Sequence, residues 1–158
     1  MTRACQTLYT SLLILVSGCA TSDAHRNPSS QPSKEVRLRF CLASSQPRDG
    51  YEPAKDEAGQ PLYVAIEPFL TQHDVLRAST LVSNRRNLVL IEFYPLATRK
   101  LDEWSAEHVG ERLAIFLNDE LVMSPVVTSR IGQGKVALEG DFSKERADAV
   151  ARTLTPEQ

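Results

Sequence analysis

The sequence lacks the residue pairs that bind metals or carry out catalysis. Its three histidines are His25, His73 and His108, and none of them pairs with another ligand at metal-binding spacing. The H-E-x-x-H, C-x-x-C and G-x-S-x-G patterns of zinc proteases, metal or redox sites and serine hydrolases are also missing. We therefore expect no metal site, no cofactor and no catalytic residue.

An excess of positive charge is missing too. The chain has 18 Lys and Arg against 20 Asp and Glu, which gives a formal net charge of −2. Proteins that bind nucleic acids need a concentrated cationic surface that displaces counterions. We expect no nucleic-acid partner.

Long apolar runs are scarce, and the one that stands out lies near the start of the chain. Leu12–Leu15 follows the basic residue Arg3 and ends on the small residues before Cys19. The run is too short to span a bilayer, and its flanks are those of a secretory signal peptide. The sequence predicts such a peptide over residues 1–18.

The end of this segment resembles the lipobox of bacterial lipoproteins, because Cys19 directly follows Gly18. The resemblance implies a lipid on the Cys19 thiol, cleavage in front of Cys19, and a membrane anchor. An aspartate after the cysteine tends to retain such proteins in the inner membrane, but this chain has Ala20. The resemblance therefore implies an outer-membrane lipoprotein that faces the periplasm. The alternative is an ordinary signal peptide with an incidental cysteine.

Cysteine is too scarce for a disulfide framework. Cys5 leaves with the signal peptide and the sulfur of Cys19 goes to the lipid, so Cys41 has no partner within the chain. The usual state of a lone cysteine in a strand is a small buried apolar residue. We expect this for Cys41.

Large apolar side chains are absent from residues 20–34, which are rich in serine, proline and polar groups. This composition predicts a flexible tether over residues 19–34. Globular sequence begins at Glu35, and the rest of the chain is long enough for one compact domain over residues 35–156.

Two-residue alternation predicts a strand that starts near Val36 and further strands over 61–66, 79–83, 87–94, 113–117, 120–123 and 135–139. Asn84–Arg86 and Asn118-Asp119 separate successive strands and predict hairpins. Pro125 predicts the end of the strand over 120–123. Serine, proline and glycine in residues 44–60 predict a long surface loop.

Helices are expected in three places. Thr71 and Asp74 resemble a capping arrangement for a short helix near 72–78. A helix from about Thr98 to Val109 would place Trp104 on its buried face as a core anchor. Ser143 is a good N-cap for a final helix, whose buried stripe consists of Ala147, Val150, Ala151 and Leu154. The pattern predicts an α+β fold with helices packed on one face of a mostly antiparallel sheet.

Several strings from residue 35 onward resemble the large periplasmic domain of SecD, a membrane subunit that assists protein export. The strings are Leu62–Val64 with Glu67–Thr71, Val109–Asp119, Ser124–Val127 and Gly140–Ser143. The resemblance implies a SecD periplasmic head-like fold over most of residues 35–156. It also implies contact with polypeptide that emerges from the translocon, but no single binding residue. Asn118-Asp119 replaces the Asp-Gly turn that is usual in the family.

These observations favour a lipid-anchored, non-enzymatic binding module that holds polypeptide or an envelope protein partner. Contact would be through a strand edge or a groove between sheet and helices, with the loops over 44–60 and 129–134 as candidate surfaces. One alternative is an envelope hydrolase, or a hydrolase accessory, built around His73 or His108 and a nearby acid. Another is a purely structural lipoprotein.

We predict that Cys19→Ser releases the protein from the membrane fraction without unfolding it, because the lipid on Cys19 is the expected anchor. Membrane sedimentation combined with circular dichroism measures both effects. Cys5→Ser serves as the control, since Cys5 is expected to leave with the leader. A Cys19→Ser protein that sediments as fully as the unchanged chain would contradict the lipoprotein interpretation.

Overall fold

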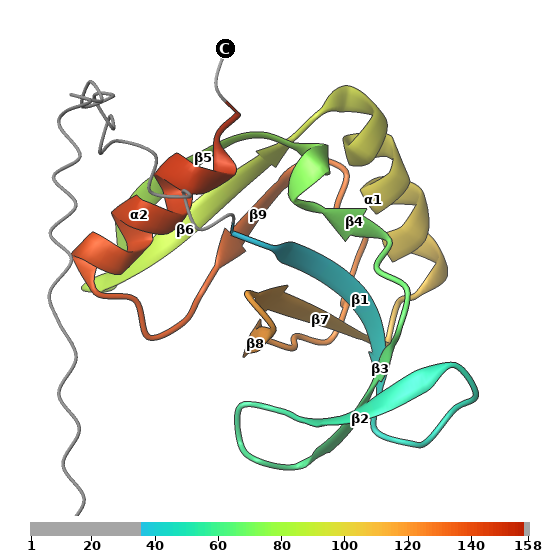
Figure 1. The fold of residues 1–158 in the computed structure, drawn as a ribbon. Coiled ribbons are helices and arrows are strands. Elements are labelled where there is room, and N and C mark those ends of the chain that lie inside the picture. Colours follow the sequence, from blue (N-terminus) through green and yellow to red (C-terminus); the bar gives the residue numbers. More distant parts are fainter. Residues whose placement is uncertain (1–35, 157–158) are drawn as a thin grey trace, which may run out of the picture. The chain divides into compact units, whose positions relative to one another are not determined.

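The computed structural model describes residues 36–156, which form two antiparallel sheets and two helices (Figure 1). The predicted signal peptide, Cys19 and the predicted tether lie outside the described residues. The first sheet has the strand order β2-β3-β1-β7-β8, and β4 also pairs with β1. Its strands are β1 (Leu38–Ser44), β2 (Tyr51–Lys55), β3 (Pro61–Ala65), β4 (Leu70–Thr71), β7 (Arg112–Leu117) and β8 (Glu120–Met123).

The second sheet has three strands in the order β5-β6-β9. They are β5 (Val75–Ser83), β6 (Arg86–Phe93) and β9 (Lys135–Leu138). The helices are α1 (Pro95–Glu107) and α2 (Lys144–Leu154), and α2 lies along β5 and β6 (Figure 1). The α+β class and the antiparallel pairing are confirmed, although the strands form two sheets where one was expected.

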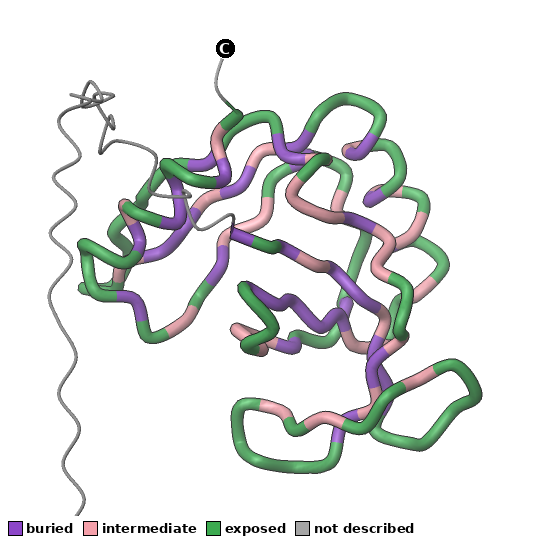
Figure 2. Tube along the Cα trace, viewed as in Figure 1, coloured by how far each residue is buried: buried purple, intermediate pink, exposed green. Residues whose placement is uncertain are grey.

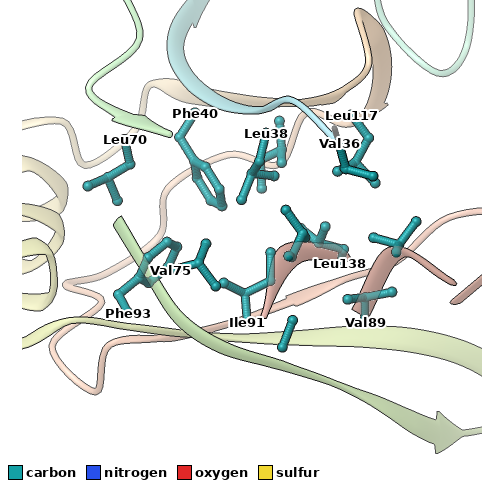
Figure 3. Close-up of a cluster of buried hydrophobic side chains, with 14 of the residues drawn as sticks. Val36, Leu38, Phe40, Leu70, Val75, Val89, Ile91, Phe93, Leu117 and Leu138 are labelled. Carbon is teal, nitrogen blue, oxygen red and sulfur yellow. The ribbon is translucent and has the colours of Figure 1, made fainter. Parts of the chain in front are cut away.

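The two sheets share one hydrophobic core. Leu38 and Phe40 of β1 point toward Ile91 and Phe93 of β6 (Figure 3). The rings of Phe40 and Phe93 meet edge to face with centroids 5.4 Å apart. Removing one such side chain from water contributes about 1.5–3 kcal/mol, so this contact is a main source of stability.

A smaller core fills the opposite side of the first sheet. Cys41, Leu62 and Ala114 are completely buried there, together with Phe116. Burial raises the pKa of the Cys41 thiol. Cys41 is thus the buried apolar residue that was expected, and β1 buries side chains on both of its faces.

Two hairpins turn through two residues each. Asn84 and Arg85 connect β5 to β6 with φ of 49° and 63°, and Asn118 and Asp119 connect β7 to β8 with φ of 51° and 67°. Positive φ at both positions is the type I′ geometry that matches the twist of paired strands. Both predicted hairpins are confirmed, and Asn118-Asp119 adopts the type I′ turn that Asp-Gly also favours.

The final helix agrees with its prediction. The Ser143 hydroxyl accepts a hydrogen bond from the Arg146 backbone N–H at 3.1 Å. The stripe predicted to be buried is buried, and α2 alternates between buried and exposed positions (Figure 2). Burial of this stripe fastens α2 to the main core.

Three expectations about element boundaries were wrong. Residues 44–60 are not one loop, because β2 pairs with β3 as a hairpin that is largely exposed (Figure 2). The helix near 72–78 is reduced to a single turn, η1 (Gln72–Asp74), because Val75 and the residues after it pair with β6. Helix α1 begins at Pro95, three residues before Thr98, because proline fits the first position of a helix.

We predict that Gly134→Ala destabilises the domain more than Gly59→Ala. Both glycines have positive φ, +64° and +77°, so an added Cβ strains each backbone by about 1–2 kcal/mol. At Gly134 the Cβ would also collide with Thr98, whose Cγ2 atom would be 2.8 Å away, whereas Gly59 has open space. Denaturant unfolding should give an additional loss of about 1–3 kcal/mol for Gly134→Ala. Equal losses would show that the Thr98 side chain moves away freely.

Candidate functional site

Strand β5 forms one edge of the second sheet, and it is long and exposed. Of its nine residues only Val75 and Ala78 are buried. Near the hairpin turn, Val82 is 67% exposed. A long edge strand presents unpaired backbone groups to which another chain can add.

The register of the hairpin shows which backbone groups point outward. Ser83 pairs with Arg86 across the two-residue turn, and such a closing pair exchanges both hydrogen bonds with the neighbouring strand. Every second residue back along β5 then directs its N–H and C=O away from β6. These residues are Val82, Thr80 and Ala78.

Ala78 already has a partner on this outer side. The Thr155 hydroxyl lies 3.1 Å from the Ala78 nitrogen and 3.1 Å from the Ala78 carbonyl oxygen. No such backbone contact occurs at Thr80 or Val82 among the hydrogen bonds of residues 36–156. These two residues therefore leave two donors and two acceptors open to a further strand.

A groove runs beside this edge, between β5 and α2. Its volume is about 530 Å³. Polar and small side chains from both elements line it: Ala78, Ser79, Thr80, Asp148, Ala151, Arg152, Thr155 and Pro156. The groove has the space, and the edge has the unpaired groups, to accept an extended chain. We call this combination the β5 groove.

Asp148, which lines the β5 groove, is held in place by a hydrogen bond and an ion pair. The Thr80 hydroxyl donates to an Asp148 carboxylate oxygen at 2.6 Å, and the Lys144 ammonium pairs with the other oxygen at 2.9 Å. The Thr80 hydrogen bond, followed by the Lys144 contact, lowers the pKa of Asp148. Asp148 is thus held as a carboxylate against β5, with the cation of Arg152 one turn along α2.

The loop over 129–134, expected as a contact surface, is docked on α1. The Arg130 guanidinium pairs with the Asp102 carboxylate, and the Ile131 backbone N–H donates to the Ser105 hydroxyl at 2.8 Å. Ser105 is completely buried. These bonds give the loop a structural role.

The other expected surface, within 44–60, is fastened by a polar network. The Glu57 carboxylate accepts hydrogen bonds from the Ser124 hydroxyl at 2.7 Å and from the Ser124 backbone N–H. Arg112 donates to the Ser124 carbonyl and hydroxyl, both at 2.9 Å, and to Asp56 at 3.3 Å. Partial desolvation acts to raise the pKa of Glu57, but the Ser124 hydrogen bonds and the charge of Arg112 outweigh it and lower that pKa. The turn between β2 and β3 is therefore fixed to the end of β8.

Neither histidine occupies a site suited to hydrolysis. His73 is exposed and contacts the side chain of Gln72 at 3.1 Å. The His108 ring stacks on Trp104 with centroids 4.5 Å apart, and its Nδ1 atom lies 2.7 Å from the Trp104 carbonyl oxygen. The nearest carboxylate to His108 is Glu111, at 4.0 Å from Nε2. Trp104 packs against the main core as expected, although it is only partly buried. The rings of Phe69 and His108 both stack on it.

Residues 36–156 contain no cluster of three or more His, Cys, Asp or Glu residues that could hold a metal ion. In the same residues, no helix has the length and apolar character needed to cross a membrane.

Sequence reasoning named a strand edge in general but missed the β5 groove. The apolar and polar alternation in residues 79–83 predicted a strand, but it did not predict which strands would pair with it or that one of its edges would be open. Contact between Ala78 and Thr155 joins residues 77 positions apart, so no local signal marks it. The two-residue turn at Asn84-Arg85 was the usable signal, because it fixes which groups of β5 point outward.

We predict that Thr80→Val raises the pKa of Asp148 toward its ordinary value, because the first of its stabilising hydrogen bonds is lost. An NMR titration of the Asp148 carboxyl carbon measures this. A carboxylate with a lowered pKa stabilises the fold above its unfolded-state pKa and loses that effect as the pH falls through its folded-state pKa. The stability difference between Thr80→Val and the unchanged chain should therefore disappear in acid. Thr153→Val is the control, since the Thr153 hydroxyl bonds to a backbone carbonyl. An unchanged Asp148 titration would show that the Thr80 bond is absent in solution.

Comparison with known proteins places this fold in one family. The model of the SecDF P1 head subdomain matches residues 48–156. SecD, a protein translocase subunit of Calditerrivibrio nitroreducens, is 32% identical over 96 residues, which are 60% of this chain and 19% of that protein. SecDF of Thermus thermophilus is 32% identical over 88 residues, or 55% of this chain and 12% of that protein. The chain thus spans about a fifth, or less, of the length of these curated relatives.

Solved structures show the same fold. A structure of SecDF, a membrane component that enhances protein export, superposes with a TM-score of 0.63 at 20% identity and covers 77% of this chain and 63% of that one. A crystal structure of SecDF in its super-membrane-facing form gives a TM-score of 0.62 at 21% identity, with 77% of this chain and 19% of that one covered.

The outer-membrane location expected from Ala20 is wrong. The relatives are subunits of the protein translocase, and translocase subunits belong to the inner membrane. That expectation depended on the single residue after Cys19, and the family of the folded domain contradicts it. The match over residues 48–156 and the shared antiparallel architecture lead to one conclusion: this chain belongs to the SecDF P1 head subdomain family.

Proposed function

We propose that this domain is a non-enzymatic module of protein export that holds an extended segment of another polypeptide along β5. The observation that carries the proposal is the pair of outward-facing residues, Thr80 and Val82, whose backbone groups lie open beside the β5 groove. Family membership supports it, because the relatives are translocase subunits and SecDF enhances protein export.

The energetics predict a weak and sequence-tolerant contact. Thr80 and Val82 offer four backbone hydrogen bonds, each of which contributes roughly 0.5–1.5 kcal/mol net. Ordering an extended chain opposes this gain by about 2–5 kcal/mol. Side-chain contacts in the β5 groove must supply most of the surplus, so micromolar or weaker affinity is expected. Backbone bonds also do not distinguish one side chain from another.

The charge on the groove wall fits a partner of varied composition. Asp148 and Arg152 carry opposite charges on one face of α2, and both line the groove. Neither sign of charge on an incoming chain is therefore excluded. A module that meets many exported proteins needs this tolerance.

Anchoring at the membrane completes the proposal. A lipid on Cys19 would attach the chain to the membrane that holds the translocase, and residues 19–34 would tether the domain of residues 35–156 to that anchor. Several acyl chains on one cysteine give a durable attachment, because each buried methylene contributes about 0.8 kcal/mol. The domain would then stay close to emerging polypeptide.

We predict that Val82→Pro weakens the binding of unfolded polypeptide at least fivefold. Proline removes an outward N–H that the β5–β6 ladder does not use, so the sheet should remain paired. The probe is fluorescein-labelled α-lactalbumin that has been reduced and carboxymethylated, and its binding to the full chain is followed by fluorescence anisotropy. Native α-lactalbumin is the folded control and should bind much more weakly.

Ala137→Pro provides the matched control variant. Ala137 lies on β9, the opposite edge of the same sheet, and the register places its N–H on the outer side of β9. It should leave binding unchanged. Equal loss in both variants, or equal binding of folded and unfolded α-lactalbumin, would contradict the proposal. Self-association that Val82→Pro abolishes, without any polypeptide binding, would assign the edge to a second copy of this chain instead.

A further inference from the structure

We infer that Thr155 determines where the polypeptide-binding edge of β5 ends. Its hydroxyl occupies the N–H and C=O of Ala78, with which a bound polypeptide would otherwise form its next pair of hydrogen bonds. This inference rests on the proposed function and deepens it. The edge has three outward-facing residues in register, Ala78, Thr80 and Val82, and one side-chain hydroxyl closes the first of them.

The geometry is that of a single-residue strand mimic. The Thr155 Oγ1 atom accepts from the Ala78 N–H at 3.1 Å. Its one proton is donated either to the Ala78 carbonyl at 3.1 Å or to the Ala151 carbonyl at 2.9 Å. An incoming strand would offer Ala78 one acceptor and one donor. The hydroxyl supplies the acceptor in full and shares its single donor between the Ala78 and Ala151 carbonyls.

The end of α2 holds this hydroxyl in position. Thr155 is the C-cap residue of α2, and its backbone N–H donates to the Ala151 carbonyl at 3.1 Å. Leu154, its neighbour, is buried in the main core. The helix end thus positions the Thr155 hydroxyl at Ala78, and the open edge is limited to Thr80 and Val82.

The experiment compares Thr155→Ala with Thr155→Ser in the full chain. Alanine removes the hydroxyl that occupies the Ala78 backbone groups, whereas serine keeps the hydroxyl and removes only a methyl group. Hydrogen exchange of the Ala78 amide is measured by NMR, and binding of labelled, reduced and carboxymethylated α-lactalbumin is measured by anisotropy. We expect at least tenfold faster exchange at Ala78 and about tenfold tighter binding for Thr155→Ala, with Thr155→Ser close to the unchanged chain.

Thr153→Ala controls for a loosened helix end. The Thr153 hydroxyl bonds to the Ala149 carbonyl at 3.0 Å in the last turn of α2. If fraying of α2 caused the tighter binding, this variant would bind more tightly as well, and the inference would be overturned.

The two proposals fail in different ways. Faster exchange at Ala78 without tighter binding, while the unchanged chain still binds, would overturn the inference and leave the proposed function standing. Unchanged exchange at Ala78 would overturn the closure itself. Absence of binding by every variant would overturn the proposed function and, with it, the role assigned to Thr155.

Discussion

The packing of β1 against β6 is the contact on which the arrangement of the domain depends. Phe40 and Phe93 meet within a core that both sheets share, so β6 must lie over the first sheet with its apolar face inward. The ladders then place β9 on one side of β6 and β5 on the other. Helix α2 packs against β5 and β6. Most side chains of β5 nevertheless stay exposed, and its edge stays open beyond Ala78.

The strings that resemble SecD mostly build this framework. Arg112 and Ser124 belong to two of them, and together with Glu57 they fix the β2–β3 turn to the end of β8. Phe142 is buried in the main core, and Ser143 caps α2. The open residues of β5 lie outside these strings. Similarity in this family therefore identifies the fold more directly than it identifies the proposed binding surface.

Features that depend on neighbouring residues were predicted correctly from the sequence, whereas features that depend on contacts between distant segments were not. The buried stripe of α2 and both two-residue turns depend on neighbouring residues, and the structure has them as expected. Strand β2 was missed because Pro53 and the glycines around it suit a loop, and pairing with β3 outweighs that preference. The helix near 72–78 was lost to pairing with β6 in the same way. Closure of Ala78 by Thr155 required the complete fold, because nothing in either segment refers to the other.

The alternation of backbone groups along β5 has a consequence for a chain that moves. Inter-strand bonding repeats every two residues, or about 7 Å of extended chain. A polypeptide that advances by two residues along Thr80 and Val82 recovers the same bonds, whereas an advance by one residue turns its bonding groups away from the edge. Such an edge would bind a moving chain at positions two residues apart and release it between those positions, and this spacing would not depend on the side chains of the bound chain.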